Sequence, residues 1–94
     1  MKVRVEYKGQ LRTALDRSED AFDLPAEADV AALFRALVQH VGPVGAPHLV
    51  AASGQPASGL LVVVNGAAVP AAQAQTMRLQ PGDVVTLLPP IAGG

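Results

Sequence analysis

The chain begins with a strict alternation of apolar and charged residues. The apolar positions are Met1, Val3, Val5 and Tyr7. A period of two is typical of a β-strand with one face packed on a core and the other in water. The alternation therefore predicts a strand over residues 2–8.

A second strand is expected soon afterwards. Residues 9–20 are mostly polar and indicate a connection, whereas residues 21–24 are a short Ala-Phe-Asp-Leu segment that Pro25 would end. We expect these two strands to pair as a hairpin.

The next segment has helical periodicity. Apolar residues recur at i, i+3, i+4, i+7, i+8 and i+11, a spacing that gathers them on one face of a helix. They are Val30, Leu33, Phe34, Leu37, Val38 and Val41. Asp29 is the predicted N-cap, and Gly42-Pro43 is expected to end the helix. The Gly-, Pro-, Ala- and Ser-rich segment 42–59 predicts a long surface loop with little packing.

The remaining strands are expected near the end of the chain. The apolar run 60–64 predicts a strand, Asn65-Gly66 favours a tight hairpin turn, and residues 67–69 would form the return strand. Residues 80–83 (Gln-Pro-Gly-Asp) then predict a turn.

Residues 84–88 predict the final strand, which Pro89-Pro90 would end. One helix can cover only one face of a sheet, so the order ββαββ predicts an α+β roll of the β-grasp (ubiquitin-like) type. We expect a mixed sheet of four to five strands with one main helix on one face, spanning residues 1–88. The first strand should lie centrally beside the last, with the chain leaving from a sheet edge.

Charge and cysteine content narrow the possible functions. Seven Lys and Arg residues against eight Asp and Glu residues give a net charge of −1, so no positive field attracts nucleic acid or an acidic membrane surface. The charged N-terminus resembles neither a signal peptide nor a membrane span, and a cytoplasmic protein is expected. The absence of cysteine excludes a disulfide framework, a thiolate metal site and a cysteine nucleophile.

No motif indicates an enzyme with its own catalytic side chains. His40 lies beside the apolar stripe of the helix and His48 in the loop, and both are expected to be structural. The sequence has no G-x-S-x-G elbow, P-loop or G-x-G-x-x-G motif. We therefore expect this chain to bind no cofactor or metal.

The last six residues present one functional group. They are Pro89, Pro90, Ile91, Ala92, Gly93 and Gly94, and we call them the tail. The two prolines fix φ and remove hydrogen-bond donors, so the tail should extend from the sheet as a flexible segment. The four residues after Pro90 reach about 13 Å when extended. The two glycines lack side chains, so the terminal carboxylate could enter a narrow channel in a partner.

These features together resemble the MoaD/ThiS family of ubiquitin-like sulfur carriers, and most of all the small subunit of molybdopterin synthase. The matching segments, which span most of the chain, are the alternating first strand, the helix 29–41, Val63-Val64-Asn65-Gly66, Leu79-Gln80-Pro81-Gly82-Asp83-Val84 and the terminal Pro-Pro-x-x-Gly-Gly. The loop 42–59 is longer than expected for compact family members. The Pro-Pro pair favours the molybdopterin branch over the thiazole branch.

The resemblance implies a carrier whose Gly94 carboxylate is adenylated and then converted to a thiocarboxylate, with Gly93 providing clearance. ATP and magnesium would be used by a ubiquitin-activating-type enzyme, and sulfur would pass to the large subunit of molybdopterin synthase or another acceptor. The chain would then be a non-catalytic subunit of a sulfurtransferase. The alternatives are carriers for cysteine, thiamine or tRNA thiolation, a protein modifier conjugated through Gly94, and a structural β-grasp binding module.

The final strand also predicts a docking surface. If Val85 and Leu87 face the helix, then Val84 and Leu88 lie on the opposite face near the base of the tail. Residues of the 60–64 run should join them there, bordered by Lys2 and Arg4. Val84 and Leu88, with the tail residues 89–92, are the predicted partner-binding residues. The alternative is that the 42–59 loop or the 73–78 segment covers this face.

Overall fold

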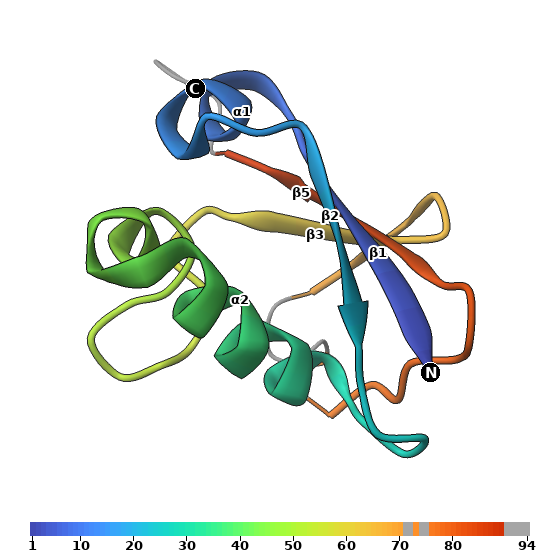
Figure 1. Cartoon of the computed structure of the whole chain (residues 1–94). Helices are drawn as coiled ribbons and strands as arrows, with labels where there is room; N and C mark the ends of the chain where they lie inside the picture. The colour runs from blue at the N-terminus through green and yellow to red at the C-terminus, as the bar shows by residue number, and fades with distance from the viewer. Residues whose placement is uncertain (71–72, 74–75, 90–94) are drawn as a thin grey trace.

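The computed structural model describes residues 1–70, 73 and 76–89. Within these residues, five strands form one mixed sheet in the order β2-β1-β5-β3-β4, with α2 across one face (Figure 1). Only the β1–β5 pair is parallel among these neighbours. This is the predicted β-grasp fold. The strands are β1 (Lys2–Tyr7), β2 (Glu19–Asp23), β3 (Leu61–Val64), β4 (Ala67–Val69) and β5 (Val84–Leu88).

The first hairpin forms as the alternation predicts. In β1, Val3, Val5 and Tyr7 are buried, and Val3 lies opposite Phe22 of the antiparallel strand β2. The strand β2 begins at Glu19, two residues before the predicted start, because its backbone pairs with β1 as far back as Glu6.

β5 occupies the centre of the sheet. It pairs in parallel with β1 on one side and antiparallel with β3 on the other, as the predicted pairing of first and last strands requires. The predicted exit of the chain from a sheet edge is wrong. The β3–β4 hairpin adds outside β5, so the chain leaves from the end of a central strand.

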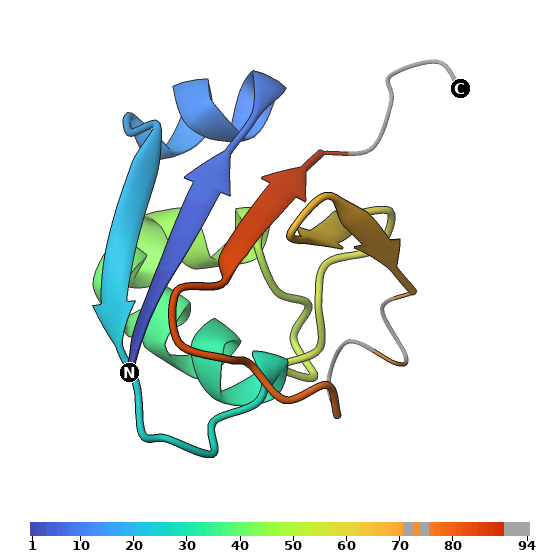
Figure 2. The ribbon, with the colours of Figure 1, turned by 90° about the vertical axis from the view of Figure 1, so that its right-hand side faces the viewer.

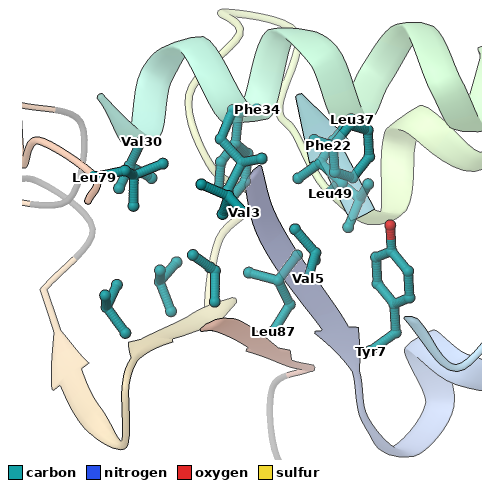
Figure 3. Close-up of a cluster of buried hydrophobic side chains, with 14 of the residues drawn as sticks. Val3, Val5, Tyr7, Phe22, Val30, Phe34, Leu37, Leu49, Leu79 and Leu87 are labelled. Atoms are coloured by element: carbon teal, nitrogen blue, oxygen red, sulfur yellow. The ribbon is translucent and has the colours of Figure 1, made fainter. Parts of the chain in front are cut away.

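The helix α2 (Val30–Gly45) covers the core. The Asp29 carboxylate accepts a 2.8 Å hydrogen bond from the Ala32 N–H, which confirms the predicted N-cap. Gly42 has φ 76° and breaks the helix, which confirms the predicted end at Gly42-Pro43; a separate helical turn then follows as far as Gly45. Four of the six stripe residues are buried and two are half-buried (Figure 3). The buried ones are Val30, Leu33, Phe34 and Leu37.

The first part of the predicted 42–59 loop belongs to the folded body. A 3₁₀ helix, η1 (Ala46–His48), follows α2, and the side chain of Leu49 is completely buried. Residues 50–59 have no helix or strand, and within them Val50 and Pro56 form an isolated β-bridge. The prediction of a weakly packed spacer failed here because one leucine in a Gly- and Pro-rich segment was enough to anchor it.

The expected connection 9–20 contains a second helix, α1 (Gly9–Leu15). Leu11 and Leu15 are one helical turn apart and both are buried. The prediction of a connection without a helix was wrong because these two leucines, surrounded by polar residues, give the segment a narrow apolar face.

Two turns fix the start of β5. Asn65 and Gly66 have φ angles of 51° and 85°, as the predicted two-residue hairpin turn requires. The Asp83 carboxylate accepts hydrogen bonds from the Asn65 side-chain amide and from the Gln80 N–H, both at 2.8 Å. The Asn65 side-chain oxygen in turn accepts from the Val84 N–H at 2.9 Å. These contacts join the β3–β4 turn to the predicted 80–83 turn.

Candidate functional site

The face of the sheet opposite α2, here called the open face, is the candidate docking surface (Figure 2). Val85 and Leu87 of β5 are completely buried under α2, whereas Val84, Thr86 and Leu88 are half-buried on the opposite side. The predicted orientation of this strand is confirmed. It places Val84 and Leu88, the two partner-binding residues predicted within the sheet, on the same face.

Four apolar side chains gather on the open face. We call them the apolar patch: Leu61, Val63, Val84 and Leu88. The sheet register places Leu61 opposite Leu88 and Val63 opposite Thr86. Leu61 is 44% exposed, although it lies in a strand between two neighbours. Such contiguous exposed apolar surface on a small domain often marks a partner site.

Charged residues occupy the other half of the open face. Arg4 lies opposite Val84 in the β1–β5 pairing, and Lys2 is exposed two residues earlier, so the predicted basic border is confirmed. Arg4 forms ion pairs with Glu6 at 3.3 Å and with Glu19 at 3.5 Å. The border is therefore a mixed and partly neutralised set of charges, which suits water better than an apolar partner.

Parts of the two segments considered as a cover lie beside α2. Residues 50–56 line two pockets there together with Phe34 and Arg35. The Val30 N–H donates to the Met77 carbonyl, and the Leu79 N–H donates to the Ala28 carbonyl, both at 3.0 Å. These bonds hold residues 77–79 beside the start of α2.

The base of the tail begins at this face. The Lys8 N–H donates to the Leu87 carbonyl at 3.0 Å, and Leu88 pairs with Leu61. Pro89 is half-buried directly beyond them. The other predicted tail residues lie outside the described residues: Pro90, Ile91, Ala92, Gly93 and Gly94.

A polar cluster that the sequence analysis missed supports this end of the sheet. We call it the Asp20 cluster: Tyr7, Arg17, Asp20 and His40. One Asp20 oxygen accepts from the Tyr7 hydroxyl at 2.9 Å and from Arg17 at 3.0 Å, and the other lies 3.3 Å from His40 Nε2. These partners come from four different elements or connections, so no spacing motif could have indicated them.

The electrostatics of the Asp20 cluster favour a charged carboxylate beside a neutral phenol. Burial tends to raise the pKa of Asp20, but the hydrogen bonds from Arg17, Tyr7 and His40 and the charge of Arg17 together lower it. Burial, followed by the hydrogen bond and the charge of Asp20, raises the pKa of Tyr7 well above its usual value. Each group is therefore held in one protonation state near neutral pH, as expected of a structural contact.

His40 is partly covered by neighbouring side chains, and His48 is exposed to solvent. The His40 ring meets the Phe22 ring edge-on, with the centroids 5.3 Å apart, and contacts Asp20. His48 is exposed at the end of η1. Among the described residues no three His, Cys, Asp or Glu side chains converge to hold a metal ion. No helix in this part of the chain is long and apolar enough to cross a membrane.

Comparisons with known proteins agree with this geometry. The ThiS family profile matches residues 5–94. No curated protein sequence matches significantly. The crystal structure of SAMP1 from Haloferax volcanii is similar with a TM-score of 0.85 at 21% identity, covering 100% of both chains. The solution structure of Urm1 from Trypanosoma brucei has a TM-score of 0.78 at 20% identity, covering 99% of this chain and 95% of that one.

A third similar structure is itself a complex. It is the protein–protein complex of subunits 1 and 2 of the molybdopterin-converting factor from Helicobacter pylori, with a TM-score of 0.66 at 22% identity and 100% coverage of both chains. At these identities the three structures establish the fold, and the profile match over nearly the whole chain establishes the family. The chain thus belongs to the ThiS family and has the β-grasp fold of the ubiquitin-like sulfur carriers and modifiers.

Proposed function

We propose that the chain is a sulfur carrier protein that delivers sulfur from a thiocarboxylate at Gly94, with molybdopterin synthesis as its pathway. The observation that supports this most is the family match, which continues through residue 94 and so includes the terminal Gly-Gly. The Pro-Pro pair at the start of the tail and the similarity to a molybdopterin-converting factor subunit favour this pathway over thiamine, cysteine or tRNA thiolation.

The proposed chemistry needs no thiol on the carrier. A carboxylate is a poor electrophile, so an oxygen of the Gly94 carboxylate first attacks the α-phosphorus of ATP and releases pyrophosphate. Hydrosulfide (HS⁻) supplied by a sulfur donor then attacks the acyl carbon of the adenylate, the bond to AMP breaks as the C–S bond forms, and loss of the S–H proton leaves a thiocarboxylate. The partner enzyme would bind ATP and magnesium and supply the catalytic side chains, and the carrier contributes the carboxylate and its positioning.

The apolar patch is the proposed docking surface for both partners. These are a ubiquitin-activating-type adenylating enzyme and the large subunit of molybdopterin synthase or another sulfur acceptor. Val84 and Leu88 lie on the open face at the strand that leads into the tail. A partner bound over them would stand within the roughly 13 Å reach of the residues beyond Pro90.

A protein modifier is the second candidate. The similarity to SAMP1, which is named a small archaeal modifier protein, supports conjugation of Gly94 to lysine side chains. Adenylation of Gly94 is common to both functions, so activation alone does not separate them. The two functions differ in what the activated carboxylate becomes, which is a thiocarboxylate in a carrier and a bond to lysine in a modifier.

Deletion of Gly94 tests the activation step. We expect the deletion to abolish ATP–pyrophosphate exchange by the cognate adenylating enzyme, because the reactive carboxylate moves back by one residue. The melting temperature should hardly change, since terminal residues contribute little burial. Gly93→Ala should reduce exchange less completely, because a methyl group narrows clearance but leaves the carboxylate in place. Exchange that persists at the wild-type rate without Gly94 would refute the proposal.

A further inference from the structure

The short helix α1 lies at the end of the sheet where β5 ends (Figures 1 and 2). Two contacts join them. The Lys8 N–H donates to the Leu87 carbonyl at 3.0 Å, which extends the β1–β5 pairing beyond Tyr7. A methyl group on Gly9 would stand 3.4 Å from Cγ and 3.6 Å from Cδ of Pro89. The Pro89 ring therefore lies against the bare backbone of Gly9.

The backbone conformation favours glycine at this position, and the Pro89 ring lies beside it. Gly9 has φ +55°, in the left-handed region that side chains disfavour. A Cβ on Gly9 would also be in van der Waals contact with the Pro89 ring, so a longer side chain that continues in this direction would displace the ring. At Gly82, which has φ +84°, nothing lies within 4 Å of the equivalent methyl position. Gly82 thus shares the backbone conformation but lacks the contact.

The support under Pro89 is itself fixed to the body. Leu11 and Leu15 anchor α1 in the core, and Leu15 packs against the backbone of Gly45 at the end of α2. After α1, Arg17 donates to the Leu15 carbonyl at 3.3 Å and to Asp20 at 3.0 Å. Gly9 is consequently held by the same core and polar cluster that hold the central strands.

We propose that Gly9 is a positioning residue for the tail, a role that rests on the proposed function. Its bare backbone seats the Pro89 ring and so sets the direction in which the chain leaves β5 toward a partner's active site. When a partner's channel holds the tail extended, a displacement at its base would shift the reactive carboxylate at its tip. Because small misplacements of reacting atoms cost large factors in rate, Gly9 should affect the turnover of activation while the apolar patch determines affinity.

The test compares Gly9→Asn with Gly82→Asn in ATP–pyrophosphate exchange by the cognate adenylating enzyme. Asparagine tolerates the left-handed region, so backbone strain stays small in both variants. We expect Gly9→Asn to lower kcat about tenfold, a fraction of the hundredfold that a 1 Å misplacement can cost, with KM unchanged. Gly82→Asn should leave both parameters near wild type. Gly9→Ala, which adds a smaller side chain but more backbone strain at this φ, replaces Gly9→Asn if that variant does not fold, with a smaller loss of kcat expected.

A double-mutant cycle separates seating of the ring from a general structural effect. In a Pro89→Ala background the ring is absent, so Gly9→Asn should cause no further loss of kcat. An unchanged kcat in Gly9→Asn, an effect on KM alone, or equal losses with and without the Pro89 ring would overturn the inference. If wild-type protein shows no exchange that depends on Gly94, the proposed function fails instead. A nuclear Overhauser contact between Gly9 Hα and the Pro89 ring, lost in Gly9→Asn, checks the seating without any enzyme.

Discussion

The covered and open faces of the sheet contain similar apolar residues that differ in how far they are buried. On the covered face, Val85 and Leu87 of β5 are completely buried against the core. On the open face, Val84 and Leu88 of the same strand are half-buried, beside the 44% exposed Leu61. Folding removes the first set from water and leaves the second partly exposed. In the described part of the chain, the open face therefore retains partly exposed hydrophobic surface, which often marks a partner site.

The open face itself has a charged half and an apolar half. Over β1 and β2 it presents charged side chains such as Lys2, Arg4 and Glu19, and over β5 and β3 it presents the apolar patch. This division follows the chain, because residues 36–94 contain only two charged side chains, Arg78 and Asp83. A docking surface with an apolar centre and a polar border is the usual arrangement of protein interfaces.

The largest expected loss of stability follows a substitution on the covered face. Leu37 of α2 is completely buried, so Leu37→Ala should lower the free energy of unfolding by about 2–5 kcal/mol in urea denaturation. Leu61→Ala on the open face is the control and should cost less than about 1 kcal/mol, since much of Leu61 already contacts water. Equal losses in the two variants would remove the distinction between the faces.

The next effect concerns the contacts that fix the start of β5 and hence its orientation. Asp83→Ala should lower the free energy of unfolding by about 1–3 kcal/mol, because the Asn65 amide and the Gln80 N–H lose their acceptor. Asp83→Asn, which keeps an acceptor oxygen, should cost less. Urea denaturation of both variants measures the difference, and equal stability of wild type and Asp83→Ala would contradict this role.

Leu88→Asp should weaken binding to the partners and leave the protein folded. We expect affinity for the adenylating enzyme and for the sulfur acceptor to fall by at least about 1–2 kcal/mol, the scale of an interface hot spot. Isothermal titration calorimetry measures both. Ala21→Asp is the matched control, because it adds the same charge to an exposed residue opposite Arg4 in the charged half. Unchanged affinity for both partners in folded Leu88→Asp would show that docking uses another surface.

The smallest effect is the pH dependence of the Asp20 cluster. The folded-state pKa of Asp20 is lowered, so its stabilisation is present above the unfolded-state pKa of about 3.9 and is lost as pH falls through the folded-state value. The stability difference between wild type and Asp20→Asn should be constant from about pH 5 to pH 7 and shrink below about pH 4. Urea denaturation at several pH values measures it, and a difference that grows on acidification would contradict the assignment.

Elements with a long periodic pattern could be predicted from the sequence, and short or tertiary features could not. The alternation of β1 and the stripe of α2 gave correct elements because many residues repeat one period. The helix α1 was missed because seven residues with two leucines give too little pattern. The buried Leu49 was missed because its neighbours are typical of loops.

The candidate site also contains features that could be predicted from the sequence and features that could not. The outward orientation of Val84 and Leu88 followed from strand alternation once Val85 and Leu87 were assigned to the core. The Asp20 cluster and the seat of Pro89 on Gly9 join residues that are far apart in the chain, so only the fold brings them together. Gly93 and Gly94, indicated by composition and resemblance, lie outside the described residues.

The most direct test of the central claim is the intact mass of the protein purified from its native host. A carrier should show a species heavier than the unmodified chain by about 16 Da, because sulfur replaces one oxygen of the Gly94 carboxylate. The species should be absent when Gly94 is deleted. Large covalent adducts through Gly94, with no thiocarboxylate species, would contradict the carrier function and establish the modifier in its place.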